Sequence, residues 1–309
     1  MLVLQSSPEH VVTVMEGLRE TFTETEIFFE KGSDILAEIP EGIERAKRIA
    51  QKSEVVVMVL GESREMSGEN HNRAFLDIPE AQRRLLQEVY RVNQNIILVL
   101  MNGRPLALTW EDRHIPAILE AWHLGDEAGH AIADVLSGDY NPSGKLTISF
   151  PRSVGQIPIY YNHKRTGRPS SQKYQDEEET PLYPFGYGLS YTTFVYKNLR
   201  FSNRTLSMGG SLTVEVEVEN AGVRDGEEIV QLYIQDITAS VTRPIKELKG
   251  FKRVCLKRGE VGRVIFTLTP KDLQMLDESF TRVAEPGRFK LWIGPNSVEG
   301  LEGEFELIR

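Results

Sequence analysis

Acidic and basic side chains are concentrated in one segment of the first half of the chain. It runs Gly61-Glu-Ser-Arg-Glu-Met-Ser-Gly-Glu-Asn-His-Asn-Arg73 and holds three glutamates, one histidine and two arginines. A carboxylic acid flanked by arginines that could orient sugar hydroxyls suits general acid–base catalysis on a glycosidic bond. That chemistry needs two carboxylates, of which this segment could supply one. A solvated connecting loop is the alternative.

Other chemistries find less support in this segment. One histidine beside carboxylates could ligate a metal, but no second histidine stands three or four residues away. The segment has no glycine-rich phosphate cradle, and neither Ser63 nor Ser67 lies in a Gly-x-Ser-x-Gly nucleophile elbow. We therefore expect no metal site and no cofactor.

The elements around the segment predict an α/β domain. Continuous apolar runs are typical of parallel strands buried on both faces, and they occur at Glu54–Leu60, Asn95–Met101 and Ile118–Trp122. Apolar residues at helical spacing predict helices over Ser6–Phe22, Pro40–Lys52, Pro79–Val92 and Glu127–Leu136. A further short strand is expected at Glu26–Glu30. This alternation predicts an α/β/α layered sandwich with a mostly parallel sheet.

The charged segment follows the first of these strands, at the edge where open α/β sheets bind ligands. Counted to Ile78 it is about eighteen residues long, whereas a plain connection takes about 2–6 residues. Its length and composition favour a functional loop. After the second strand, Asn102–Pro105 predicts a turn from which Arg104 could contact a ligand.

The second half of the chain alternates apolar and polar residues, which is typical of half-exposed antiparallel strands. The pattern occurs at Ser211–Glu219, Glu228–Gln235, Gly262–Leu268 and Gly287–Ile293. About seven short strands predict a fibronectin type III-like or immunoglobulin-like β-sandwich. Cys255 lies in an apolar stretch and is expected to be buried. We expect an α/β domain over 1–165, a linker over 166–192 and the β-sandwich over 193–309.

Composition excludes several classes of protein. The formal net charge of −9 disfavours a broad nucleic-acid surface, which needs clustered cations. No apolar run approaches the ~20 residues that a membrane-spanning helix requires. A single cysteine excludes internal disulfides and multi-thiolate zinc sites. We expect neither nucleic acid nor a membrane among the partners.

Long motifs connect the chain to a known family. Three of them are Val99–Leu108, Gly138–Leu146 and Ser149–Tyr161, and two more are Pro181–Phe194 and Val241–Phe251. The first three strongly resemble glycoside hydrolase family 3, in particular its bacterial periplasmic β-glucosidases. The last two resemble the fibronectin-like C-terminal domain of that family.

The resemblance implies an enzyme of three parts. A barrel domain carries a nucleophilic aspartate, the α/β domain carries an acid/base glutamate, and a fibronectin-like domain follows. Hydrolysis is retaining, through a covalent glycosyl-enzyme. The family's acid/base position matches Glu69, and the resemblance places Met66, His71 and Arg73 in substrate binding. The barrel is missing from this chain, so we expect the chain to be inactive alone.

The resemblance also implies partners and a location. The expected partners are an oligosaccharide or β-glucoside and the missing barrel, with a homodimer left open. The expected location is periplasmic or secreted. Specificity for β-xylosides or α-arabinosides is one alternative function. A barrel-less carbohydrate-binding or scaffolding protein is another.

Overall fold

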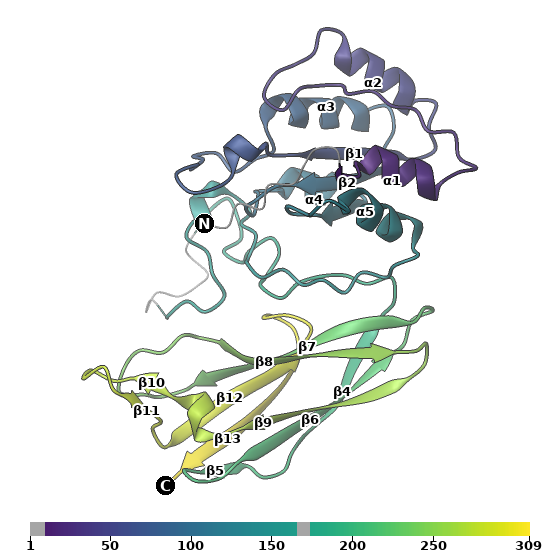
Figure 1. Ribbon diagram of the computed structural model, residues 1–309. Helices are drawn as coiled ribbons and strands as arrows, with labels where there is room; N and C mark the ends of the chain where they lie inside the picture. Colours follow the sequence, from purple (N-terminus) through teal and green to yellow (C-terminus); the bar gives the residue numbers. More distant parts are fainter. Residues whose placement is uncertain (1–9, 166–173) are drawn as a thin grey trace. The chain divides into compact units, whose positions relative to one another are not determined.

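In the computed structural model, which describes residues 10–165 and 174–309, a three-stranded parallel sheet forms the centre of the first half of the chain (Figure 1). Its strands lie in the order β1-β2-β3 and span Val56–Gly61, Ile96–Met101 and Ala117–Glu120. The pairing runs in register from Val56 opposite Ile96 to Gly61 opposite Met101. All three carboxyl ends therefore reach the same edge of the sheet.

Helices cover both faces of this sheet (Figure 1). They are α1 (Val14–Thr21), α2 (Gly42–Ala50), α3 (Glu80–Tyr90), α4 (Thr109–His114) and α5 (Ala128–Ser137). Helices α1 and α5 pack on the face that carries Val57, Val99 and Leu119. Helices α2 and α3 contact each other on the opposite side, where α3 buries Leu86 and Val89. The layered α/β/α prediction is confirmed.

Two local predictions in this half are wrong, and one helix was not predicted. The first helix begins at Val14 and not near Ser6, because Thr13 and Glu16 form a capping box there. Residues 6–9 lie outside the described residues. Glu26–Glu30 forms no strand: Phe29 is 63% exposed and no neighbouring strand pairs with it. Helix α4 was not predicted, because one turn and a half is too short to show a period.

The second half forms two packed antiparallel-rich sheets. One has the order β4-β6-β9, and its strands are Phe194–Phe201, Leu212–Asn220 and Val261–Leu268. The other has the order β5-β13-β12-β7-β8, with strands Thr205–Ser207, Leu301–Ile308, Gly287–Gly294, Gly226–Asp236 and Glu247–Leu256. A small hairpin joins β10 (Met275–Leu276) to β11 (Arg282–Val283). Alternate residues of β6, from Leu212 to Val218, are fully buried in the core between the sheets. The β-sandwich prediction is confirmed.

Cys255 is exposed, and its predicted burial is wrong. It lies in β8, where the pleat turns Val254 and Leu256 toward the core and Cys255 away from it. Its thiol donates a hydrogen bond to Glu227 on β7 (3.2 Å).

The chain divides into two compact units, and each unit is built from two separate segments of the sequence. The first unit takes the residues up to Tyr140 and Phe150–Ile157, and the second takes Asn141–Ser149 and the described residues from Pro158 onward. Within the second unit, the Lys145 ammonium lies 3.1 Å from the buried carboxylate of Glu228. Of the expected linker, residues 166–173 lie outside the described residues. None of the described helices is long and apolar enough to cross a membrane.

Candidate functional site

Polar residues stand at the carboxyl ends of all three parallel strands. Glu62 follows β1, Asn102 follows β2, and Glu120 is the last residue of β3. The loops after these strands converge at Gly103. A Cβ atom there would lie 2.3 Å from Oγ of Ser67 and 2.8 Å from Nε2 of His123, so any larger residue would displace these side chains. This sheet edge is the candidate site.

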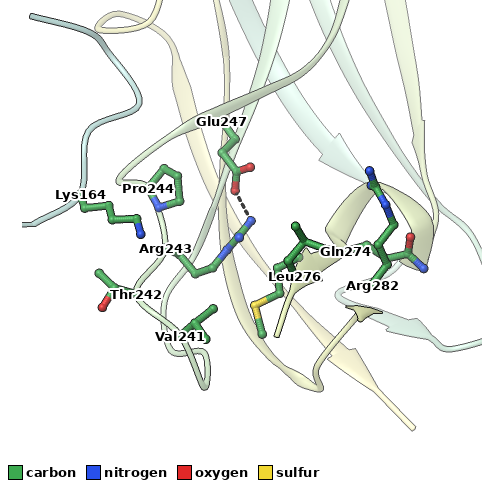
Figure 2. Close-up of a pocket in the computed structure, with 10 residues that line it drawn as sticks. Lys164, Val241, Thr242, Arg243, Pro244, Glu247, Gln274, Leu276 and Arg282 are labelled. Atoms are coloured by element: carbon green, nitrogen blue, oxygen red, sulfur yellow. Dashed lines mark hydrogen bonds and ion pairs between the residues drawn. The ribbon is translucent and has the colours of Figure 1, made fainter. Parts of the chain in front are cut away.

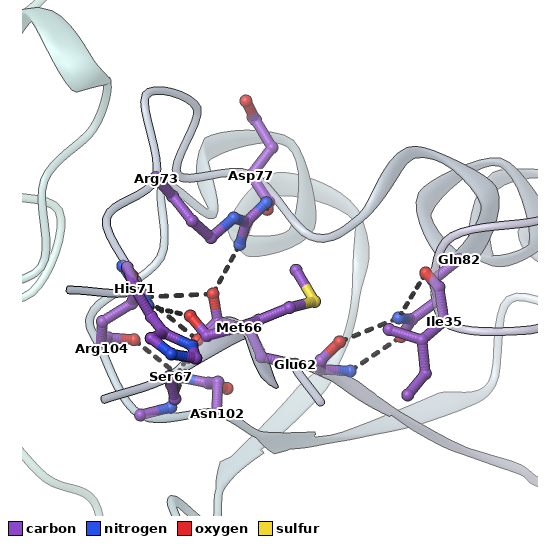
Figure 3. Close-up of polar contacts among 12 residues, drawn as sticks. Ile35, Glu62, Met66, Ser67, His71, Arg73, Asp77, Gln82, Asn102 and Arg104 are labelled. Atoms are coloured by element: carbon purple, nitrogen blue, oxygen red, sulfur yellow. Dashed lines mark hydrogen bonds and ion pairs between the residues drawn. The ribbon is translucent and has the colours of Figure 1, made fainter. Parts of the chain in front are cut away.

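A buried glutamine fixes the end of the edge strand β1. The Gln82 side chain accepts a hydrogen bond from the Gly61 N–H (2.8 Å) and donates to the Gly61 carbonyl (2.8 Å). It also donates to the Ile35 carbonyl (3.0 Å). Gly61 has φ 148°, and a Cβ there would lie 2.0 Å from the Met101 carbonyl oxygen. The backbone that leads into Glu62 is thus rigidly held (Figure 3).

The Glu62 side chain has no solvent exposure and is surrounded by donors (Figure 3). Arg73 donates from Nη1 at 2.7 Å and Arg104 from Nε at 3.1 Å. The Ser67 hydroxyl (3.1 Å) and the Gly103 N–H (3.4 Å) also point at it. Burial acts to raise the pKa of Glu62, but the hydrogen bonds from Arg73, Arg104 and Ser67 outweigh it and hold that pKa below its usual range. Glu62 is therefore an ionised buried carboxylate.

The two arginines extend from Glu62 to the backbone of the charged loop. Arg104 donates from Nη2 to the carbonyls of Met66 and His71, the latter at 2.9 Å. Arg73 donates from Nη2 to the carbonyl of Asp77 (3.0 Å). The loop is thereby tied at three carbonyls to guanidiniums that share one carboxylate.

Glu69 lies in an exposed turn of this loop. The turn closes with a hydrogen bond from the His71 N–H to the Gly68 carbonyl (3.2 Å), and Asn70 within it adopts φ 66°. His71 is exposed, and its Nδ1 contacts the Glu65 carbonyl. Met66 is half-buried at the end of a short 3-10 helix, Arg64–Met66. Met66, Glu69 and His71 thus share one short stretch of loop, as their places in the sequence already require.

Arg73 has a different setting from the other three predicted site residues. Its side chain is 17% exposed, and its guanidinium is directed inward to Glu62. Glu62 also pairs with Arg104, which stands 42 residues away, and no local pattern in the sequence predicts that contact. One signal was available for Glu62: a carboxylate directly after a buried strand, with arginines close behind, marks a charge that must be paired.

Glu120 carries the most strongly shifted carboxyl at this edge. Burial raises the pKa of Glu120 to about 8, although hydrogen bonds from Trp122 and Asn102 oppose the shift. The Trp122 N–H lies 3.2 Å from Oε1, and Trp122 itself adopts φ 52°. The negative charge of Glu62 adds to the rise. Glu120 is therefore protonated at neutral pH.

The carboxyl groups at this edge differ in what they can do. Glu62 is saturated with donors, and Glu120 is a buried acid. Glu69, like Glu65, faces solvent on a loop held from beneath, a setting that suits proton exchange with a ligand. Among the described residues, no three His, Cys, Asp or Glu side chains form a group that could hold a metal ion.

A hollow of about 450 Å³ lies in the β-sandwich unit (Figure 2). Lys164, Arg243 and Arg282 line it together with Glu247. Arg243 is paired with Glu247 at 2.7 Å, as Figure 2 shows. Its one carboxylate is held in that ion pair, so this hollow is not the candidate catalytic site.

The chain matches two described domains. Residues 3–191 match the Glycosyl hydrolase family 3 C-terminal domain, and residues 228–297 match the Fibronectin type III-like domain. The chain belongs to glycoside hydrolase family 3.

Named relatives agree with this membership. A periplasmic β-glucosidase of Salmonella typhimurium is 48% identical over 274 residues, which cover 86% of this chain and 36% of that enzyme. A β-xylosidase of Formosa agariphila is 42% identical over 292 residues, covering 94% of this chain and 40% of that enzyme. The crystal structure of a Listeria innocua β-glucosidase in complex with glucose matches with a TM-score of 0.89 and 39% identity, covering 97% of this chain and 42% of that one. The chain thus spans well under half the length of these relatives.

Proposed function

We propose that this chain is the acid/base portion of a retaining β-glucosidase-type glycoside hydrolase, and that Glu69 is the general acid/base. Glu69 would protonate the leaving-group oxygen and then deprotonate the water that attacks the glycosyl-enzyme. Met66 and His71, which flank it on the same loop, would contact the sugar. The observation that carries the proposal is the exposed Glu69 turn, anchored from beneath at the carboxyl edge of a parallel sheet.

The nucleophile is proposed to come from a barrel domain of the same protein. The relatives are more than twice as long as the matched region, since this chain covers 36–42% of them. A retaining glycosidase needs two carboxylates about 5–5.5 Å apart, and the Glu69 turn presents one. We propose export to the periplasm, on the strength of the Salmonella typhimurium relative's name.

The first prediction concerns activity. The purified chain should not hydrolyse an aryl β-glucoside. A hybrid enzyme in which this chain replaces the matching part of the Salmonella typhimurium β-glucosidase should be active. Glu69→Gln in the hybrid should lower kcat/KM for phenyl β-glucoside, whose poor leaving group needs a proton, by about 10²–10⁴-fold, the usual contribution of general acid–base catalysis.

The controls separate the rival functions. Glu65→Gln, on the same exposed loop, should leave the hybrid active. A hybrid that keeps full activity with Glu69→Gln would refute the catalytic role and favour a carbohydrate-binding module. Because a β-xylosidase covers 94% of this chain, the assay should compare aryl β-glucoside with aryl β-xyloside. Faster hydrolysis of the xyloside would change the proposed substrate from β-glucosides to β-xylosides.

A further inference from the structure

No residue between Ser63 and Asp77 is buried, so the loop that carries Glu69 has no fully buried apolar anchor; Met66 and Leu76 are half-buried. Its turns close over three residues, as in the hydrogen bond from the Met66 N–H to the Ser63 carbonyl (3.0 Å). Such short-range bonds shape a turn without fixing its place in the molecule. The position of the loop must come from longer-range contacts.

Apart from the hydrogen bond from the Ala107 N–H to the Leu76 carbonyl (2.9 Å), the longer-range polar contacts of the backbone between Ser63 and Asp77 converge on one carboxylate. Arg104, from the loop after β2, reaches the carbonyls of Met66 and His71, which bracket Glu69 on both sides. Arg73 holds the far end of the loop at the Asp77 carbonyl. Both guanidiniums are placed by Glu62, which is itself fixed to the sheet by the end of β1.

We propose that Glu62 is a positioning residue for the acid/base, acting through Arg73 and Arg104 on the backbone turn that presents Glu69. The proposal rests on the proposed function of Glu69. The negative charge of Glu62, and not only its shape, is what holds the turn. A neutral side chain of the same size leaves two partly buried guanidiniums without their counter-charge, and at 17% and 20% exposure these can turn toward water. The three carbonyls that they hold are then released.

The test in the hybrid enzyme is Glu62→Gln, assayed on aryl β-glucosides with poor and good leaving groups. A displaced acid/base slows the poor leaving group, whose departure needs a proton, far more than the good one. We expect a loss of about 100-fold in kcat/KM for phenyl β-glucoside, since a misplacement of about 1 Å can have that effect. The loss for 2,4-dinitrophenyl β-glucoside should be several-fold at most. Equal losses on both substrates would overturn the proposal.

A double variant separates positioning from general damage. With phenyl β-glucoside, Glu62→Gln combined with Glu69→Gln should be no slower than Glu69→Gln alone, because a missing acid cannot be misplaced. If the fold-losses in kcat/KM of the two single variants multiplied in the double variant, the proposal would be contradicted. The matched control is Glu30→Gln, which breaks another carboxylate–arginine pair of the same unit (Arg45, 3.0 Å) away from the loop. It should change neither substrate's rate.

A measurement on the chain itself does not depend on catalysis. Hydrogen exchange should show faster amide exchange across residues 66–71 in Glu62→Gln than in the unmodified chain, and no change in Glu30→Gln. Unchanged exchange in Glu62→Gln would overturn the proposal. Suppose that Glu69→Gln is fully active in the hybrid but exchange across residues 66–71 is faster in Glu62→Gln. Glu62 would then still position the loop, and only the assignment of Glu69 as the acid/base would fail.

A second variant covers the case in which Glu62→Gln does not fold. Arg104→Lys keeps a cation beside Glu62 but loses the guanidinium fork that reaches two carbonyls at once. It should show the same selective loss on phenyl β-glucoside, at about 10-fold. Retention of wild-type rates and exchange by this variant would refute the proposal.

Discussion

At the scale of single residues, the carboxyl edge of the sheet holds Glu62 and Glu120 in opposite protonation states. Two arginines keep Glu62 ionised, whereas burial keeps Glu120 protonated with a pKa of about 8. The difference follows from the donors around each group: guanidiniums at Glu62, and one backbone N–H and one amide at Glu120. A second ionised carboxylate at this edge would repel the first.

The shift of Glu120 predicts a pH dependence of stability. In the unfolded chain Glu120 loses its proton near pH 4.5. In the folded chain the same carboxyl keeps its proton up to about pH 8. The folded state binds more protons in this window, so the free energy of unfolding should fall as the pH rises from 4.5 to 8. Its slope from this group should be at most about 1.4 kcal/mol per pH unit. Glu120→Gln imitates the neutral form and should remove this slope.

Urea unfolding of both chains at pH 5, 6, 7 and 8 measures the difference. Other titrating groups contribute equally to both chains and cancel in the comparison. Parallel slopes for the two chains would show that Glu120 titrates normally in the folded state.

At the scale of elements, the end of β1 depends on α3. β1 is an edge strand, so the N–H and carbonyl of Gly61 that face away from β2 need partners outside the sheet. Gln82 on α3 supplies both and reaches Ile35 as well. One side chain thus joins a helix, a strand end and a loop just before Glu62.

Gln82→Leu should therefore destabilise the α/β unit. The substitution removes the hydrogen-bond partners of the Gly61 N–H and carbonyl. Each of these groups, left buried without a partner, lowers the free energy of unfolding by about 1–3 kcal/mol. We expect a loss of about 2–4 kcal/mol in the free energy of unfolding, measured by urea denaturation followed by circular dichroism. Gln87→Leu, on the same helix and half-buried, should cost less than about 1 kcal/mol. Equal effects of the two substitutions would contradict this account.

At the scale of the whole molecule, the second unit includes a segment that precedes the end of the first. Asn141 donates to the Asp225 carbonyl (2.9 Å), and Lys145 pairs with Glu228, whose side chain is 4% exposed. A chain cut at residue 193 would lack both partners.

This arrangement predicts that residues 141–309 are more stable than residues 193–309. Removal of Lys145 leaves Glu228 buried without its counter-charge, a change that costs about 3–5 kcal/mol. Denaturant midpoints of the two fragments measure the difference. The single substitution Lys145→Met in the longer fragment should reproduce much of it, and equal midpoints for all three would rule out a structural role of the early segment.

Several features follow from the sequence alone. Buried strands and amphipathic helices were predictable because their apolar periods are local, and the alternation in β6 predicts its buried face directly. The Thr13–Glu16 capping box also fits a local sequence pattern, although the helix was predicted to begin nearer the N-terminus, at Ser6. The loop that carries Glu69 was identified from its charge, its length and its place after a buried strand.

Other features were decided only by the tertiary structure. The pairing of Glu62 with Arg104 depends on which strands are neighbours, and the order β1-β2-β3 brings the two loops together. The inward direction of Arg73 follows from the same carboxylate. The exposure of Cys255 depends on the register of β8 against β7. Local patterns record how a segment repeats, but a contact between distant segments depends on the packing of the whole chain.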